Sequence, residues 1–164
     1  IAWMFKGQYP AMPFNQQMSF PCELTLRSTP EGIRLCRWPI KEIESICSSY
    51  KRIRPRTLKP GGVNPFKDIS GELFDIEAVI ALGKAREVCF VIRGQVYSYD
   101  VRRKILSGKG SVTTPLAPVD GRIGLRFLVD RSSIEVFGND GLASRSDCVL
   151  FPEHDRSMNL CVHG

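Results

Sequence analysis

The sequence predicts an all-β protein, built as an antiparallel β-sandwich or barrel. Apolar and polar residues alternate with a period of two along most of the chain, as they do in strands that bury one face. Turn-forming residues separate these runs at spacings of roughly 8–12 residues, which is typical of antiparallel hairpins. A chain of 164 residues is also long enough for one domain that buries a core without a metal or a disulfide.

The first expected hairpin lies near the N-terminus. Leu24 and Leu26 alternate with polar residues and therefore share one strand face, and a turn at 29–32 leads into a second strand. A short helix is expected at 41–46, because this segment follows a proline and places two isoleucines three residues apart. Residues 7–21 contain three prolines and are the expected linker.

Five further strands are expected where apolar residues alternate or run continuously, at 74–82, 88–92, 96–101, 124–129 and 134–137. The run at 88–92 is apolar throughout, which is typical of a strand covered on both faces. Asp130 can bond within its own turn, and Gly138 and Gly141 tolerate a positive φ after the last of these strands. The sequence begins without a methionine and in a strand-like run, so we expect the chain to be part of a longer protein.

The charge balance permits several kinds of partner and requires none of them. Lysine and arginine exceed aspartate and glutamate by six, and the most basic stretch is 51–59, with a smaller group at 102–104. Neither stretch is accompanied by a helical recognition pattern or paired stacking aromatics, so a solvated surface or a domain contact is favoured over polyanion binding. No apolar run approaches the ~20 residues of a membrane helix. We therefore expect neither a nucleic acid nor a membrane as partner.

Six cysteines occur without any C-x-x-C pair, at positions 22, 36, 47, 89, 148 and 161. Cys22, Cys36, Cys89 and Cys161 lie in strand-like runs and are expected to be buried free thiols. An oxidising compartment would allow many pairings, among which the sequence does not choose. Both histidines lie close to the C-terminus, and no metal-ligand spacing is present, so no metal site is expected.

No constellation of catalytic residues is evident. Asp75 and Glu77 share one strand face but alternate with apolar residues, which is the ordinary pattern of a solvated sheet surface. No G-x-S-x-G elbow is present for a serine nucleophile, and no complete phosphate-binding loop occurs.

A second pair of carboxylates flanks the turn after 124–129. Asp130 is expected to cap that turn, and Glu135 to form a surface ion pair with Arg126 or Arg131. These structural roles leave no catalytic residue to assign.

Two segments of the sequence resemble motifs of a known protein family. Residues 124–141 (GLRFLVDRSSIEVFGNDG) resemble the D-R-S-S-(V/I)-E-V-F-x-N-x-G signature in the C-terminal β-sandwich of glycoside hydrolase family 32, which contains invertases, levanases and inulinases. Residues 12–27 (MPFNQQMSFPCELTLR) resemble the M-S-(F/I)-P-R-E-L-x-L junction between the catalytic propeller and the sandwich, with Cys22 where arginine is usual. The exchange removes a possible charged contact to the propeller. The resemblance extends over residues 1–160.

The resemblance implies a fold and a domain division. Residues 18–164 would form the C-terminal β-sandwich, of the jelly-roll or concanavalin type. Residues 1–17 would contain the last strand of an upstream five-bladed propeller and the linker. The three catalytic carboxylates of the family lie in the propeller motifs W-M-N-D-P-N-G, R-D-P and E-C, which this sequence lacks. Trp3 and Met4 are followed by Phe5 and Lys6 in place of Asn and Asp, no Arg-Asp-Pro occurs, and Cys22-Glu23 is the E-C dipeptide reversed. No catalytic residue is therefore transferred to this chain.

The resemblance further implies the role of the chain. It would be the supporting domain of a β-fructosidase of the levanase or fructan-hydrolase type, which cleaves fructosyl bonds with retention and without a metal or organic cofactor. Its partner would be the catalytic propeller of the same polypeptide, contacted by Trp3, Met18, Phe20 and Pro21. The substrate of the parent would be fructan or sucrose. Secretion or periplasmic export is expected for a polymeric substrate, although the sequence leaves a cytoplasmic location open.

An alternative function is a lectin-like module that binds fructan without cleaving it. The available aromatic residues are Phe90, Tyr97, Tyr99, Phe127 and Phe137. Tyr97 and Tyr99 share one strand face and are the candidate sugar-binding residues, although packing in a core explains them equally well. Trp3 and Trp38 could each stack on a sugar, but a core or interface position is the commoner one for a single strand tryptophan.

Overall fold

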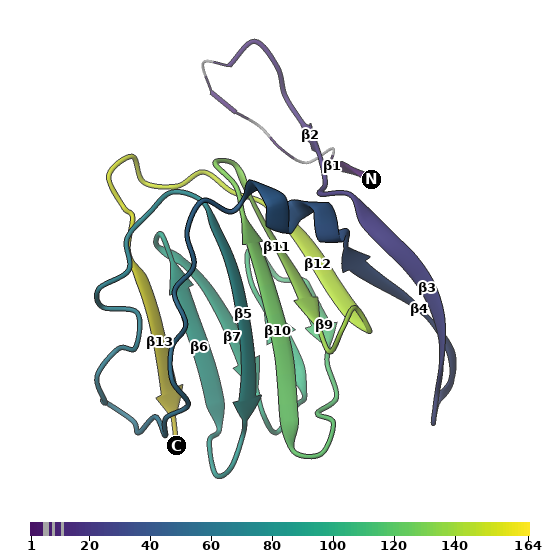
Figure 1. Ribbon diagram of the computed structural model, residues 1–164, viewed down its shortest axis with the longest axis vertical. Coiled ribbons are helices and arrows are strands. Elements are labelled where there is room, and N and C mark those ends of the chain that lie inside the picture. Colours follow the sequence, from purple (N-terminus) through teal and green to yellow (C-terminus); the bar gives the residue numbers. More distant parts are fainter. Residues whose placement is uncertain (5–6, 8, 11) are drawn as a thin grey trace.

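Two antiparallel sheets pack face to face in the computed structural model, which describes residues 1–4, 7, 9, 10 and 12–164 (Figure 1). The four-stranded sheet has the order β12-β11-β10-β5. Its strands are β5 (Phe74–Ala81), β10 (Arg122–Val129), β11 (Ser133–Gly138) and β12 (Ala143–Cys148). The five-stranded sheet has the order β13-β6-β7-β8-β9. Its strands are β6 (Glu87–Ile92), β7 (Gln95–Asp100), β8 (Ile105–Ser107), β9 (Thr113–Pro115) and β13 (Met158–His163). The predicted all-β sandwich is confirmed.

The N-terminal elements lie outside the two main sheets. β1 (Trp3–Met4) pairs with β2 (Gln17–Met18), and β3 (Cys22–Thr29) forms a long hairpin with β4 (Gly32–Pro39). Figure 1 shows this hairpin extending along one side of the sandwich, beyond β12. The predicted helix is confirmed as a 3₁₀ helix, η1 (Lys41–Ile46). Phe5 and Lys6, on which part of the motif comparison rests, lie outside the described residues.

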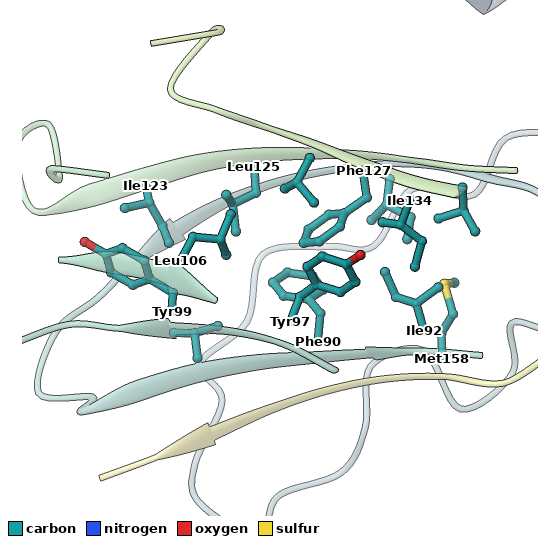
Figure 2. Close-up of a cluster of buried hydrophobic side chains, with 14 of the residues drawn as sticks. Phe90, Ile92, Tyr97, Tyr99, Leu106, Ile123, Leu125, Phe127, Ile134 and Met158 are labelled. Carbon is teal, nitrogen blue, oxygen red and sulfur yellow. The ribbon is translucent and has the colours of Figure 1, made fainter. Parts of the chain in front are cut away.

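The main core fills the space between the two sheets (Figure 2). Phe90 and Tyr97 rise from the five-stranded sheet and meet Phe127 of β10, with ring centroids 4.7 and 5.7 Å from that of Phe127. These aromatic residues are fully buried, and the surrounding aliphatic residues come from both sheets. Burial of this apolar area, together with the tilted and edge-on ring contacts, holds the sheets together.

The outer face of the four-stranded sheet is also covered. Leu128 and Phe137 point away from the main core and pack with Ile43 of η1. Partly buried residues complete this outer cluster, namely Phe20, Cys22, Trp38 and Ile40. Every residue of β11 is consequently buried, although its sequence alternates in the manner of a half-exposed strand. The residues that precede β3, which we call the entering segment, therefore lie against β11 through Phe20. This contact defines the candidate site.

Candidate functional site

Glu135 of β11 is fully buried at the point where the N-terminal segment meets the sandwich. Its Oε2 accepts hydrogen bonds from Arg37 Nη2 at 2.5 Å and from Ser146 Oγ at 2.7 Å. Its Oε1 accepts a hydrogen bond from the backbone N–H of Phe20 at 2.6 Å. One carboxylate thus joins β11, β12, the hairpin strand β4 and the entering segment. We call Glu135, Arg37, Ser146 and the Phe20 N–H the junction site.

The predicted surface ion pair of Glu135 with Arg126 or Arg131 is wrong. Glu135 pairs with Arg37, which is 98 residues away in sequence, and its carboxylate is fully buried while the Arg37 side chain is 24% exposed. Asp130 does bond within its own turn, as expected, by accepting from the backbone N–H of Arg131 at 2.7 Å. Glu135 and Phe137 are two residues apart and therefore share one face of β11. The large aromatic side chain of Phe137 on that face is the sequence feature that indicates burial of the face by another part of the protein.

The turn after β10 forms a second contact with the entering segment. Ser132 Oγ donates to Gln17 Oε1 at 2.6 Å, while Gln17 Nε2 and the Tyr9 hydroxyl each donate to the Ser132 carbonyl oxygen at 3.4 Å. Burial, followed by the neighbouring Cys148, raises the pKa of Tyr9 to about 12. Residues 124–141, which we call the signature segment, therefore bind the entering segment twice, through Ser132 of the turn and through Glu135 of β11.

The last residues of the signature segment, 139–141, bind the β3–β4 hairpin. The N–H of Arg37 donates to the Gly141 carbonyl oxygen at 3.0 Å, and Arg27 donates to the carbonyl oxygens of Asn139 and Asp140. Gly141 has a φ of +87°, and a Cβ atom there would collide with the carbonyl group of Arg37. A glycine is thus required by both the backbone conformation and the close approach of β4.

The four predicted interface residues occupy two different environments. Trp3 and Met18 face each other across the β1–β2 pair, and both are more than half exposed. The Trp3 indole Nε1 donates to Gln16 Oε1 at 2.7 Å. Phe20 and Pro21 are half-buried, and Phe20 packs into the outer cluster of the sandwich itself.

The hairpin presents an additional apolar surface that the sequence analysis did not assign to an interface. Four aliphatic residues on the β3–β4 hairpin are 60–73% exposed, and they are Leu24, Leu26, Ile33 and Leu35. Leu26 lies directly opposite Leu35, so these side chains share one face, which we call the hairpin face. The opposite face bears Cys36, which is buried and accepts from Arg27 Nε at 2.9 Å. The hairpin is thus fastened to the sandwich through Arg27, Arg37 and Trp38, while the four aliphatic side chains of the hairpin face remain exposed.

The other carboxylates considered for catalysis are held in structural contacts. Asp75 is not on a solvated surface as expected, because Arg126 donates to both of its carboxylate oxygens at 2.9 and 2.7 Å. The Arg126 guanidinium lies 5.6 Å from the centroid of the Trp38 ring, which covers it. Glu77 remains mostly exposed, with its Oε1 3.4 Å from Arg126 Nε.

Tyr97 and Tyr99 are buried between the sheets. Figure 2 shows both rings pointing from the five-stranded sheet into the core. The Tyr97 hydroxyl donates to Asp147 Oδ2 at 2.9 Å, and the Tyr99 hydroxyl donates to the Leu116 carbonyl oxygen at 2.8 Å. Neither ring lies on an open sheet face, so their burial fits core packing and argues against the sugar stacking of the alternative function.

The stability of the domain is expected to fall at alkaline pH because of Tyr97. Burial, followed by the charge of Asp147, raises the pKa of this phenol above its ordinary value of 10.0. Above pH ~10 the Tyr97 phenol ionises in the unfolded chain but stays protonated in the folded chain, so the free energy of unfolding decreases as pH rises. Urea unfolding at pH 8, 10 and 11 should show a shallower decrease for Tyr97→Phe, which keeps the ring and removes the ionisable group. Equal decreases in both proteins would contradict this role.

The remaining sequence candidates are spread over the surface or within strands. Residues 51–59 form an exposed loop in which Lys51 Nζ donates to the Asp68 carbonyl oxygen at 3.4 Å.

All six cysteines are free thiols. Of the four that were expected to be buried, Cys36 and Cys89 are buried, whereas Cys22 and Cys161 are partly exposed. Cys22, at the position where the family junction has arginine, accepts from Arg37 Nε at 3.3 Å. Within the described residues, no group of three or more His, Cys, Asp or Glu could hold a metal ion, and no helix is long and apolar enough to span a membrane.

Comparisons with known proteins place the chain in a family. The profile described as "Glycosyl hydrolases family 32 C terminal" matches residues 42–162. The levanase of Bacillus subtilis (strain 168) is 34% identical over 186 residues, covering 98% of this chain and 28% of the levanase. The extracellular exo-inulinase inuE of Aspergillus ficuum is 27% identical, covering 94% of this chain and 34% of the relative.

A solved structure has the same fold. The crystal structure of the exo-inulinase from Aspergillus awamori matches 99% of this chain and 37% of the inulinase chain, with a TM-score of 0.81 and 25% sequence identity. This chain therefore spans about a third of the length of the proteins that it resembles. The profile covers most of the chain and includes β11 and β12 of the junction site, whereas Phe20 and β4 precede the matched residues. The chain belongs to the C-terminal domain family of the family 32 glycosyl hydrolases.

Proposed function

We propose that this chain is the C-terminal supporting domain of a fructan hydrolase of the levanase or inulinase type, and that it is inactive by itself. The observation that carries the proposal is the junction site, where Glu135 joins the entering segment to both the sandwich and the hairpin. A domain whose buried carboxylate fixes the segment before it is suited to hold a preceding domain in one orientation. The relatives are about three times longer than this chain, which leaves room for a catalytic domain in the same polypeptide.

The catalytic propeller before this domain is the proposed partner. Trp3, Met18, Phe20 and Pro21 would contact it beside the linker, and the hairpin face would extend the contact along the side of the sandwich. Exposed aliphatic residues grouped on one strand face are typical of a surface that another domain covers. Residues 1–17 would then belong to the last propeller strand and the linker.

The parent enzyme would hydrolyse fructosyl bonds of levan, inulin or sucrose with retention of configuration. That chemistry needs two carboxyl groups ~5–5.5 Å apart that are free to act on the substrate. Asp75 and Glu135 are each engaged by a buried or half-buried arginine, so this domain would not supply them. Secretion is proposed because a fructan polymer must be cut outside the cell, and the related inulinases bear the name extracellular.

Activity and binding assays test the proposed role. The purified chain should release no fructose from levan, inulin or sucrose, and it should not sediment with insoluble levan. Fructose release would contradict the assignment as a supporting domain. Cosedimentation with levan would instead favour the lectin-like module.

Substitutions on the hairpin face test the proposed interface. In the longer protein, Leu26→Asp and Ile33→Asp should lower the Tm, whereas in the isolated chain they should change it little, because both side chains are exposed there. Val79→Asp is a matched control, since Val79 is an equally exposed aliphatic residue on β5. An unchanged Tm of the longer protein would show that this face does not contact the propeller.

A further inference from the structure

Two cysteines lie directly opposite each other in the β6–β13 pair. The register places Cys161 across from Cys89. The flanking residues Val88 and Phe90 point into the main core. Because side chains alternate along a strand, Cys89 and Cys161 both lie on the other face of the five-stranded sheet.

The position of this cysteine pair fits disulfide geometry. The Arg93 N–H donates to the Ser157 carbonyl oxygen, and hydrogen-bonded pairs recur every second residue, so Cys89 and Cys161 form such a pair. Its Cα atoms are about 5.5 Å apart, within the range of about 4.4–6.8 Å found in disulfides. The Cys161 thiol already contacts the Cys89 residue, with its Sγ 3.6 Å from the Cys89 carbonyl oxygen. A disulfide also needs Cβ atoms about 3.5–4.5 Å apart, so the two side chains must rotate and the two strands must move slightly closer, with no change in register.

The other cysteines lack this arrangement. Cys22 lies opposite Pro39, Cys36 opposite Thr25, and Cys148 opposite Ser133, while Cys47 follows η1. In the part of the chain that the structure describes, Cys89 and Cys161 are thus the cysteines that face each other across a ladder.

We propose that Cys89 and Cys161 form a cross-strand disulfide when the protein is in an oxidising compartment. The bond would tie the edge strand β13 to its neighbour β6. The proposal rests on strand register and is independent of the proposed enzymatic role. An extracellular location would supply the oxidising conditions.

The reaction requires an oxidant of the disulfide class, such as oxidised glutathione or a thiol–disulfide oxidoreductase. The partly exposed Cys161 thiolate attacks the oxidant disulfide, and one thiol of the oxidant leaves. The Cys89 thiolate then attacks Sγ of Cys161, and the second thiol leaves. Two cysteine thiols lose two electrons and two protons, and the oxidant disulfide is reduced to two thiols. Burial raises the pKa of Cys89 to about 12, so the second step is expected to be the slower one.

The disulfide would close a long loop, because the two cysteines are 72 residues apart. Cross-linking such a loop restricts the unfolded chain more than the folded one. Reduction of the oxidised protein should therefore lower its Tm by about 5–10 °C.

Mass spectrometry and thermal unfolding test the proposal on the chain as it is. After incubation with oxidised glutathione, alkylation in denaturant should label four cysteines, and proteolysis should yield one linked peptide pair that contains Cys89 and Cys161. The reversible Tm shift should be absent in Cys161→Ser and present in Cys47→Ser, the control at a partly exposed cysteine outside the strands.

Three results would overturn the proposal. The first is alkylation of all six cysteines after oxidation, which would mean that no disulfide forms. The second is a disulfide-linked peptide pair that contains other cysteines. The third is glutathione that stays bound to Cys161. Peptide mapping of the unaltered chain gives the answer even if Cys161→Ser fails to fold.

Discussion

Replacing Glu135 with alanine is expected to lower the free energy of unfolding by about 3–5 kcal/mol. The substitution leaves Arg37 without its carboxylate and removes the acceptor for the N–H of Phe20. The Arg37 side chain is only 24% exposed, so without Glu135 its charge is left poorly solvated and unpaired. The segment that enters the domain should also lose its attachment, with faster hydrogen exchange at the Phe20 amide.

Urea unfolding and hydrogen exchange of the purified chain measure this effect. Glu135→Gln should be less destabilising than Glu135→Ala, because the amide oxygen can still accept from Phe20. Glu77→Ala is the matched control on the same sheet, where an exposed carboxylate contributes about 0–1 kcal/mol. If Glu135→Ala and Glu77→Ala had equal effects, Glu135 would not organise the junction.

Replacing Phe127 with alanine is expected to lower the free energy of unfolding by about 3–5 kcal/mol. Phe127 is fully buried at the centre of the sandwich, where its ring contacts those of Phe90 and Tyr97. Alanine would leave a cavity between two sheets that cannot close without moving both. The loss therefore combines the transfer of a large apolar group with the cost of the cavity.

Urea unfolding also measures this second effect. Phe127→Leu should cost clearly less, since it fills most of the space. Val79→Ala should change the free energy by no more than about 0.5 kcal/mol, because Val79 is 75% exposed on the same sheet. A small effect of Phe127→Ala would mean that the sheets are held together elsewhere.

The strands could be predicted from the sequence because their periodicity is local. The alternation at 74–82 and 124–129 corresponds to β5 and β10, and the turn at 29–32 joins β3 to β4. The apolar run at 88–92 is β6, and the isoleucine spacing at 41–46 corresponds to η1. Each of these features depends on residues within a few positions of one another, so no distant contact was needed to find it.

The tertiary structure alone decided which strand faces are covered. A period of two separates two faces, but it does not tell which face meets solvent. The alternation along β11 predicts that Glu135 faces solvent, whereas the tertiary structure buries it completely. Tyr97 and Tyr99 were equally compatible with an open face and with the core, and the pairing of the two sheets buried them.

The sequence by itself thus determined the all-β class, the main strand positions and the family resemblance. The junction site, the hairpin face and the opposition of Cys89 to Cys161 came only from the tertiary structure. Each depends on residues brought together over long sequence separations, 98 residues for Arg37 and Glu135 and 72 for the two cysteines. Strand order and register set those pairings, and they are fixed by burial of the whole core rather than by the local pattern of any strand.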